Sequence, residues 1–99
     1  MANQISFTAK VEKSPRTGGW HYVGLSSKVI EEIRIMSGKN GNVPVLAAIG
    51  NTIWQSTIMS RGNQQWYVAL KAEVRTAESI FEGEMVKVRI EPDWDRIKK

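Results

Sequence analysis

The stretch ISFTAKVE at residues 5–12 alternates apolar and polar side chains without a break. A period of two residues is typical of a strand with one buried and one solvated face, so this stretch predicts the clearest strand of the chain. Residues 14–19 (SPRTGG) are rich in turn-forming types, and residues 20–25 (WHYVGL) resume with aromatic and β-branched side chains. The three segments together predict a β-hairpin.

The pattern changes to a helical period after this hairpin. Ser26 or Ser27 can cap a helix, and Gly38 can end it because glycine tolerates a positive φ. Between these residues, apolar side chains recur on one helix face at Val29, Ile30, Ile33 and Met36. We therefore expect one short amphipathic helix before the next strands.

A second hairpin is predicted in the middle of the chain. Two strand-like runs, residues 43–49 and 52–59, are separated by Gly50 and Asn51 alone. Such a dipeptide favours a tight two-residue turn. Pro44 has no backbone N–H, so we expect the first run to pair at an edge or near its own start.

Two more strands are expected at residues 66–70 and 86–90, with a turn at residues 61–63 before the first of them. The segment between them, residues 71–81, fits either a continued strand or a helix with Val74, Ala77 and Phe81 inward. We prefer the helix, because Ala and Glu dominate and Gly83 follows at a suitable stop. About six short strands with one or two short helices predict a mainly β fold, either a small barrel or a compact sheet.

The size and composition indicate one ordinary domain. A chain of 99 residues with 41% hydrophobic side chains supports a single core, so we expect one domain over residues 1–99. No apolar run approaches the roughly 20 residues that span a bilayer. Residues 1–6 lack the pattern of a signal peptide, so we expect a cytoplasmic protein with no membrane partner. The absence of cysteine excludes disulfides, thiolate nucleophiles and cysteine-based metal sites.

The net charge of +4 is concentrated at the C-terminal end. Arg96, Lys98 and Lys99 supply three of these charges, and the rest of the chain has 11 basic and 10 acidic residues. The body is therefore nearly neutral, and residues 94–99 are interpreted as a basic, solvated tail. This distribution does not favour nucleic acid as the partner.

Few residues have the types and spacing that catalysis or metal binding needs. The single histidine, His21, lies in an aromatic strand with no accompanying nucleophile motif, which favours a packing or surface role over a general base. Glu91, Asp93 and Asp95 could gather oxygen ligands, but Pro92 interrupts any EF-hand pattern. We predict no catalytic residue, no metal site and no cofactor.

Three side chains are candidates for ligand binding. If residues 71–81 are helical, Lys71 and Arg75 stand one turn apart on one face and can clamp a carboxylate or phosphate. The plainer interpretation, which the frequency of such pairs on helices favours, is two solvated charges paired with Glu73 or Glu78. Trp54 is either a core side chain, which we prefer, or an aromatic platform in the mouth of a barrel.

Several segments share their order and spacing with one known family. The matching segments are residues 7–9 (FTA), 19–23 (GWHYV), 43–45 (VPV), 49–50 (IG), 54–58 (WQSTI), 67–71 (YVALK), 74–75 (VR) and 83–88 (GEMVKV). Over residues 5–93 the chain resembles a small bacterial family known only as a domain of unknown function. Its members occur alone or joined to the OmpD-associated bacteriocin-protection type of domain.

The resemblance implies a small closed β-barrel with short helices, similar in look to double-psi barrels, and it supports the helix at residues 71–81. It implies no catalytic residues. The chain departs from the family pattern at Ser26 and Ala69, where proline is common, and at Glu84, where aspartate is usual after Gly83. The last departure puts in doubt any role that needs the shorter carboxylate.

The sequence leaves three classes of function open. The first hypothesis is a non-enzymatic binding or interaction module that receives a small anion or a protein partner through Lys71, Arg75 and Trp54. The second is weak binding of single-stranded nucleic acid through tryptophan and the basic tail. The third is an enzyme that uses His21 or the terminal acids. A homo-oligomer is possible in each case.

Overall fold

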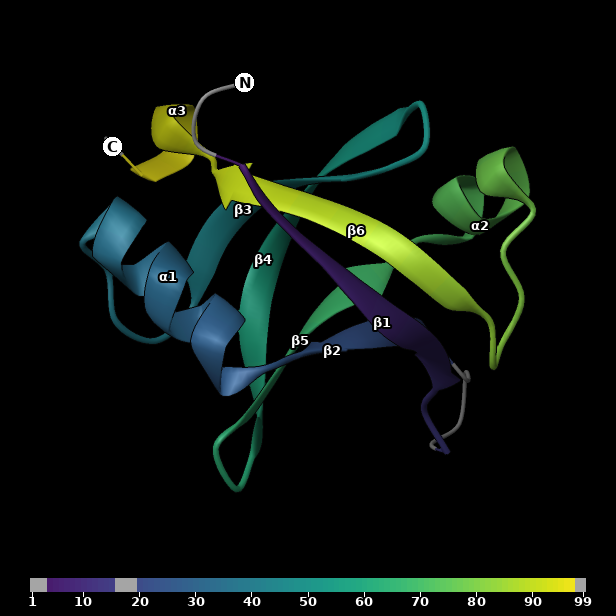
Figure 1. Cartoon of the computed structure of the whole chain (residues 1–99), viewed down its shortest axis with the longest axis horizontal. Helices are drawn as coiled ribbons and strands as arrows, with labels where there is room; N and C mark the ends of the chain where they lie inside the picture. The colour runs from purple at the N-terminus through teal and green to yellow at the C-terminus, as the bar shows by residue number, and fades with distance from the viewer. Residues whose placement is uncertain (1–3, 16–19, 98–99) are drawn as a thin grey trace.

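Six antiparallel strands close into a barrel in the computed structural model, which describes residues 4–15 and 20–97 (Figure 1). The strands are β1 (Ile5–Lys13), β2 (His21–Leu25), β3 (Val43–Ile49), β4 (Thr52–Gly62), β5 (Gln65–Leu70) and β6 (Met85–Pro92). The helices are α1 (Ser27–Ser37), α2 (Ala72–Glu78) and α3 (Trp94–Ile97). The order around the barrel is β1-β2-β5-β4-β3-β6, with β6 paired to β1. The predicted mainly β fold with a closed barrel is confirmed.

The period of two in the strands determines which side chains fill the barrel. Residues that face each other in an antiparallel ladder point to the same side of the sheet. Val23 of β2 faces Val11 on one neighbour and Val68 on the other, and Phe7 faces Val88 across β1 and β6. The four valines are completely buried. The alternation first recognised in residues 5–12 therefore specifies the inner face of the barrel.

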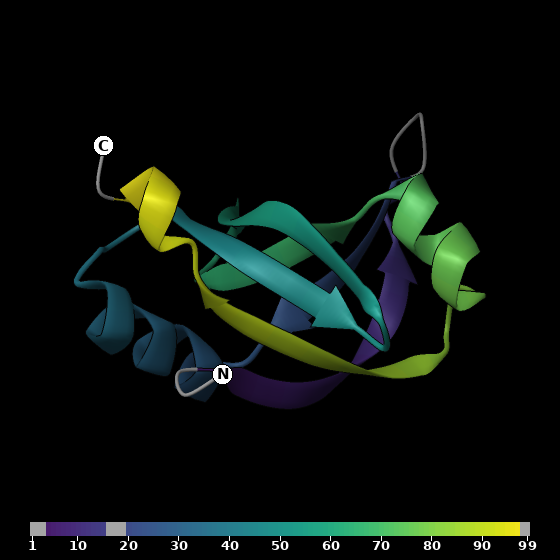
Figure 2. The same cartoon turned by 90° about the horizontal axis from the view of Figure 1, so that it is seen from above.

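The helices lie at the two ends of the barrel, α1 and α3 at one end and α2 at the other (Figure 2). Helix α1 buries the face that carries Val29, Ile30 and Ile33, as predicted. The Ser26 hydroxyl accepts a hydrogen bond from the backbone N–H of Val29 at 3.3 Å, and Gly38 ends the helix with φ at 72°. Both predicted caps of this helix are confirmed.

Helix α2 confirms the preferred interpretation of residues 71–81 but is shorter than expected. It ends at Glu78 because Ser79 takes a left-handed conformation and donates its backbone N–H to the carbonyls of Arg75 and Thr76. Val74 is buried as predicted, whereas Ala77, which was also expected to point inward, is exposed. Phe81 was predicted to point inward and is instead 71% exposed, because the early stop brings Ile80 into the core in its place.

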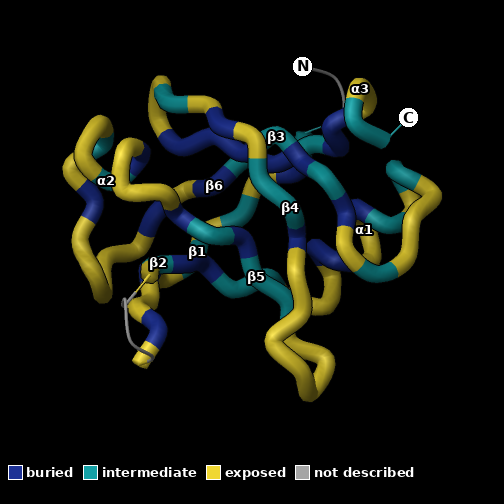
Figure 3. Tube along the Cα trace, turned by 180° about the vertical axis from the view of Figure 1, so that it is seen from behind, coloured by how far each residue is buried: buried dark blue, intermediate teal, exposed yellow. Residues whose placement is uncertain are grey.

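The hairpin between β4 and β5 turns later than the sequence indicates. We expected a turn at residues 61–63, but β4 continues to Gly62, and the two turn residues are Asn63 and Gln64, both with positive φ. Two consecutive positive φ angles give the turn that best matches the twist of a hairpin. The tip of this hairpin is exposed and projects from the barrel (Figure 3).

One part of the barrel wall is not joined by backbone pairing. β4 and β5 are paired near their hairpin, from Gly62 opposite Gln65 to Met59 opposite Tyr67. Residues 52–58 of β4 are paired with β3, and residues 68–70 of β5 with β2, but not with each other. We call this unpaired part of the wall the β4–β5 seam.

Arg96 is anchored to the barrel, which corrects the prediction of a solvated tail at this residue. Its Nε atom forms an ion pair with Asp93 at 2.6 Å, and Asp93 is buried. Its Nη2 atom donates to the carbonyl oxygens of Val45 at 2.8 Å and Ser56 at 2.6 Å. Helix α3 is thereby held against β3 and β4. Lys98 and Lys99 lie outside the described residues.

Candidate functional site

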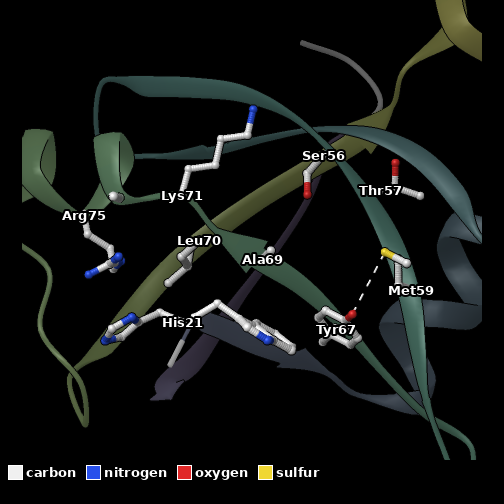
Figure 4. A pocket seen from close by; sticks show the side chains of 11 residues that line it. His21, Ser56, Thr57, Met59, Tyr67, Ala69, Leu70, Lys71 and Arg75 are labelled. Atoms are coloured by element: carbon white, nitrogen blue, oxygen red, sulfur yellow. Dashed lines mark hydrogen bonds between the residues drawn. The ribbon is translucent and has the colours of Figure 1, made fainter. Parts of the chain in front are cut away.

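A pocket of about 510 Å³ opens at the β4–β5 seam (Figure 4). Its walls come from β4 and β5, from the start of β2 and from the first turns of α2. The basic side chains that line it are His21, Lys71 and Arg75, and the larger apolar and aromatic ones are Trp20, Met59, Tyr67 and Leu70. No acidic residue is among the described residues of the lining. The lining therefore combines positive charge with apolar surface.

Two polar atoms in the pocket wall are buried and have no hydrogen-bond partner among the described residues. They are Nδ1 of His21 and Nε of Arg75. Figure 4 shows the two side chains close together, with the Arg75 guanidinium directed toward the His21 ring. Buried polar atoms are almost always paired with protein groups or with water, so each of these two atoms needs a partner from outside the described residues.

The surroundings of His21 keep its imidazole neutral near pH 7. Burial lowers its pKa from the ordinary 6.5, and the positive charges of Arg75 and Lys13 lower it further. The carboxylate of Glu82 acts weakly in the opposite direction. A neutral imidazole presents either a donor or an acceptor at Nδ1, according to its tautomer, so His21 can adapt to the group it meets.

The structure brings Lys71 and Arg75 to the same pocket, but their charged ends diverge. Figure 4 shows the Lys71 amine extended toward β4, whereas the Arg75 guanidinium lies beside His21. In the described part of the chain neither cation forms an ion pair with Glu73 or Glu78. The Glu78 carboxylate instead accepts a hydrogen bond from the Thr52 hydroxyl at 2.6 Å. Of the plainer interpretation, the solvated position of Lys71 is seen, whereas the pairing with Glu73 or Glu78 is not seen among the described residues.

Trp54, the third predicted binding residue, lies behind the pocket. Its side chain is 7% exposed and packs in the barrel core. Its indole Nε1 donates a hydrogen bond to the carbonyl oxygen of Ala69 at 3.3 Å. Ala69 belongs to the lining and Trp54 does not. The preferred interpretation of Trp54 as a core residue is confirmed, and its indole supports the wall from inside.

An aromatic cluster that sequence reasoning did not single out forms the outer side of the pocket. The rings of Trp20 and Tyr67 lie 5.2 Å apart, and both contact the ring of Tyr22, at 5.2 and 5.7 Å. The guanidinium of Arg61 lies over the Tyr22 ring at 4.6 Å and donates to its hydroxyl. Alternation along residues 20–25 places Trp20 and Tyr22 on one face. Their contact with Tyr67 depends on the register between β2 and β5, which local sequence does not indicate.

A second, more polar hollow of about 860 Å³ lies between α1 and the β4–β5 hairpin. The guanidinium of Arg34 stacks on the Trp66 ring there at 4.7 Å, and Glu31 belongs to the same lining. This hollow therefore carries both signs of charge. In the described residues no group of three or more histidine or acidic side chains could hold a metal ion, and Glu91, Asp93 and Asp95 form no such group.

A family model described as a domain of unknown function, DUF1905, matches residues 7–90. The chain belongs to the DUF1905 family. This confirms the resemblance noted in the sequence, and every residue that lines the seam pocket of this DUF1905 domain falls inside the matched range. No curated protein matches the chain. Among the residues described, no helix has the length and apolar character needed to cross a membrane.

Proposed function

We propose that this DUF1905 domain is a binding module whose seam pocket receives a small anion. Arg75 is the main recognition group, His21 supplies a second hydrogen bond, and Lys71 adds charge at the entrance. The Trp54 indole holds the wall in place from behind. We propose binding because the charge and the shape of the pocket are complementary to a small anion.

The observation that carries the proposal is the pair of unpartnered buried atoms, Nε of Arg75 and Nδ1 of His21, in one wall. A guanidinium is always charged in a protein and gains most from a carboxylate or phosphate oxygen. As far as the structure describes the lining, it contains no acidic residue that could satisfy the guanidinium internally. An anion from solution would supply the missing acceptor, and the apolar surface beside Arg75 strengthens its attraction to the guanidinium.

The test is calorimetric titration of the purified protein with sodium acetate, inorganic phosphate and sodium benzoate at matched ionic strength. We expect at least one of these probes to bind. For each probe that binds, Arg75→Gln should lower the affinity about tenfold or more, since it removes a charge-assisted hydrogen bond. Lys71→Gln should have a smaller effect, because this side chain is exposed and its charge is screened.

Lys87→Gln is the matched control, because it removes the same unit of charge from an exposed position on β6. It should leave the affinities unchanged. The proposal is overturned if none of the three probes binds, or if Lys87→Gln weakens binding as much as Arg75→Gln. The alternative function, weak binding of single-stranded nucleic acid, is tested by titration with oligothymidylate at low salt. If Arg75→Gln and Lys87→Gln weaken the binding of oligothymidylate equally, the chain attracts a polyanion through its overall charge and not through the pocket.

A further inference from the structure

The seam pocket has a basic side and an aromatic side. Figure 4 shows Arg75 and His21 on one side, Tyr67 and Met59 on the other, and Leu70 and Ala69 between them. Trp20 stacks against Tyr67 on the aromatic side, with an angle of 32° between the ring planes. A ligand that satisfies the whole lining therefore has one anionic end and an apolar body.

The size of the pocket also argues against a bare inorganic ion. Pockets of roughly 300 to 1,000 Å³ are typical of sites for organic ligands, and this one measures about 510 Å³. A phosphate or acetate held at Arg75 would leave the surfaces of Tyr67, Met59 and Trp20 facing water. Methionine sulfur and aromatic rings both make favourable contacts with an aromatic ligand.

The donors on the basic side suit a carboxylate better than a phosphate. Arg75 has a planar guanidinium that can bind both oxygens of a carboxylate in one plane. His21 offers a single hydrogen bond and, when neutral, no further charge. Phosphate sites usually add several backbone N–H groups from a glycine-rich turn, and no glycine is among the described residues of this lining.

We propose that the seam pocket selects an aromatic carboxylate, with the carboxylate on Arg75 and His21 and the ring among Trp20, Tyr67 and Met59. This inference rests on the proposed function and narrows it to one class of ligand. The ring lies along the seam with Leu70 and Ala69 beneath it. Lys71 closes the entrance above the bound molecule.

The experiment compares 2-naphthoate with its neutral amide, 2-naphthamide, and with acetate and phosphate. We expect 2-naphthoate to bind at least about tenfold more tightly than each of the other three, because only it uses both sides of the pocket. Arg75→Gln should abolish the preference for naphthoate over naphthamide. Trp20→Ala should weaken naphthoate and leave the affinity for acetate unchanged. Lys87→Gln serves again as the control.

The outcomes separate this inference from the proposed function. If acetate or phosphate binds as tightly as 2-naphthoate, the assignment to aromatic carboxylates is overturned and the anion site stands. If the amide binds as tightly as the acid, or if no probe binds, both proposals fall. Thermal melting of each variant without ligand shows whether it has folded.

A measurement on the unmodified protein gives an independent answer. The imidazole of His21 can be titrated by NMR with and without saturating 2-naphthoate. A carboxylate within hydrogen-bond distance favours the protonated ring, so its pKa should rise on binding. An unchanged titration with naphthoate bound would place the carboxylate elsewhere and overturn the assignment.

Discussion

The indole nitrogen of Trp54 lies 3.3 Å from the carbonyl oxygen of Ala69 and donates a hydrogen bond to it. This bond spans the β4–β5 seam, where the two strands are not paired with each other. A side chain thus takes the place of a backbone hydrogen bond in closing the barrel. The same carbonyl belongs to a residue of the pocket lining, so closure of the barrel and the shape of the pocket depend on one contact.

Replacing Trp54 with phenylalanine tests this contact. Trp54→Phe keeps an aromatic ring in the core but leaves the Ala69 carbonyl without its donor, which should cost about 1–2 kcal/mol of unfolding free energy. Urea unfolding measures the loss. Trp94→Phe, at an exposed tryptophan of α3, is the control and should be nearly neutral. Equal effects of the two changes would show that the bond across the seam contributes nothing.

The tight approach of α2 to the β3–β4 turn gives a second prediction. A Cβ atom added to Gly50 would lie 2.1 Å from Oε1 of Glu78, and Gly50 also has a positive φ of 56°. Gly50→Ala should therefore destabilise the protein by about 1–3 kcal/mol in urea unfolding. Gly41→Ala is the matched control, because Gly41 also has a positive φ but no atom within 4 Å of the added carbon.

The excess cost at Gly50 over Gly41 then measures what it costs to move the Glu78 carboxylate away from the new methyl group and from Thr52. Adding Glu78→Ala to Gly50→Ala should recover this excess, since the carboxylate that blocks the new methyl group is gone. If the losses of unfolding free energy in the two single variants simply add in the double variant, the Glu78 carboxylate does not lie beside the new methyl group.

Arg96 provides a third test, because it neutralises a buried acid. Arg96→Met leaves Asp93, which is 4% exposed, without its ion-pair partner and removes the donor from two carbonyl oxygens. We expect a loss of about 2 kcal/mol, at the low end for a broken buried pair because the Arg96 side chain is 33% exposed. The loss is measured by urea unfolding against Lys87→Met, which should be nearly neutral. Equal losses of unfolding free energy in the two variants would show that the contacts of Arg96 contribute nothing, as expected of the solvated tail first predicted.

The lowered pKa of His21 predicts how stability depends on pH. In the unfolded chain the ring has its ordinary pKa of 6.5, and burial and Arg75 lower this value in the fold. Below pH 6.5 the imidazole of His21 binds a proton more readily in the unfolded chain than in the folded protein. The contribution of His21 to stability is therefore fully present above pH 6.5 and falls as the solution is acidified.

Comparing the wild type with His21→Gln isolates this contribution. The difference in unfolding free energy between them should shrink or reverse as the pH falls below 6.5, because only the wild type loses stability through the imidazole. Urea unfolding over a pH series is the measurement. If the unfolding free energies of the two proteins change in parallel with pH, the imidazole of His21 titrates alike in the folded and the unfolded state.

The strands were predictable because each carries its pattern locally. Residues 5–12 specify β1 by alternation, and Gly50 with Asn51 specifies the turn between β3 and β4 without reference to the rest of the chain. The end of α2 was harder to predict. It depends on Ser79 taking a left-handed conformation, which a serine seldom does, so the later Gly83 was the better guess from local preference.

The candidate site was predicted only in part. Spacing on a helix placed Lys71 and Arg75 on one face, and the structure brings both to the pocket. His21 lies 50 positions before Lys71, and it reaches the same wall because the ladder sets His21 opposite Leu70, next to Lys71. Nothing local in the sequence fixes that register. For the same reason, nothing local in the sequence indicates that the rings of Trp20 and Tyr67 lie together.

The β4–β5 seam has a consequence for the diversity of such domains. A wall held by side chains can be altered by substitution without disturbing the paired ladders that support the rest of the barrel. Exchanges at the lining residues Tyr67 or Met59 would reshape the pocket while the ladders between β1, β3 and β6 stay as they are. Point mutations in the lining can therefore change the shape of the pocket while these paired ladders stay in place.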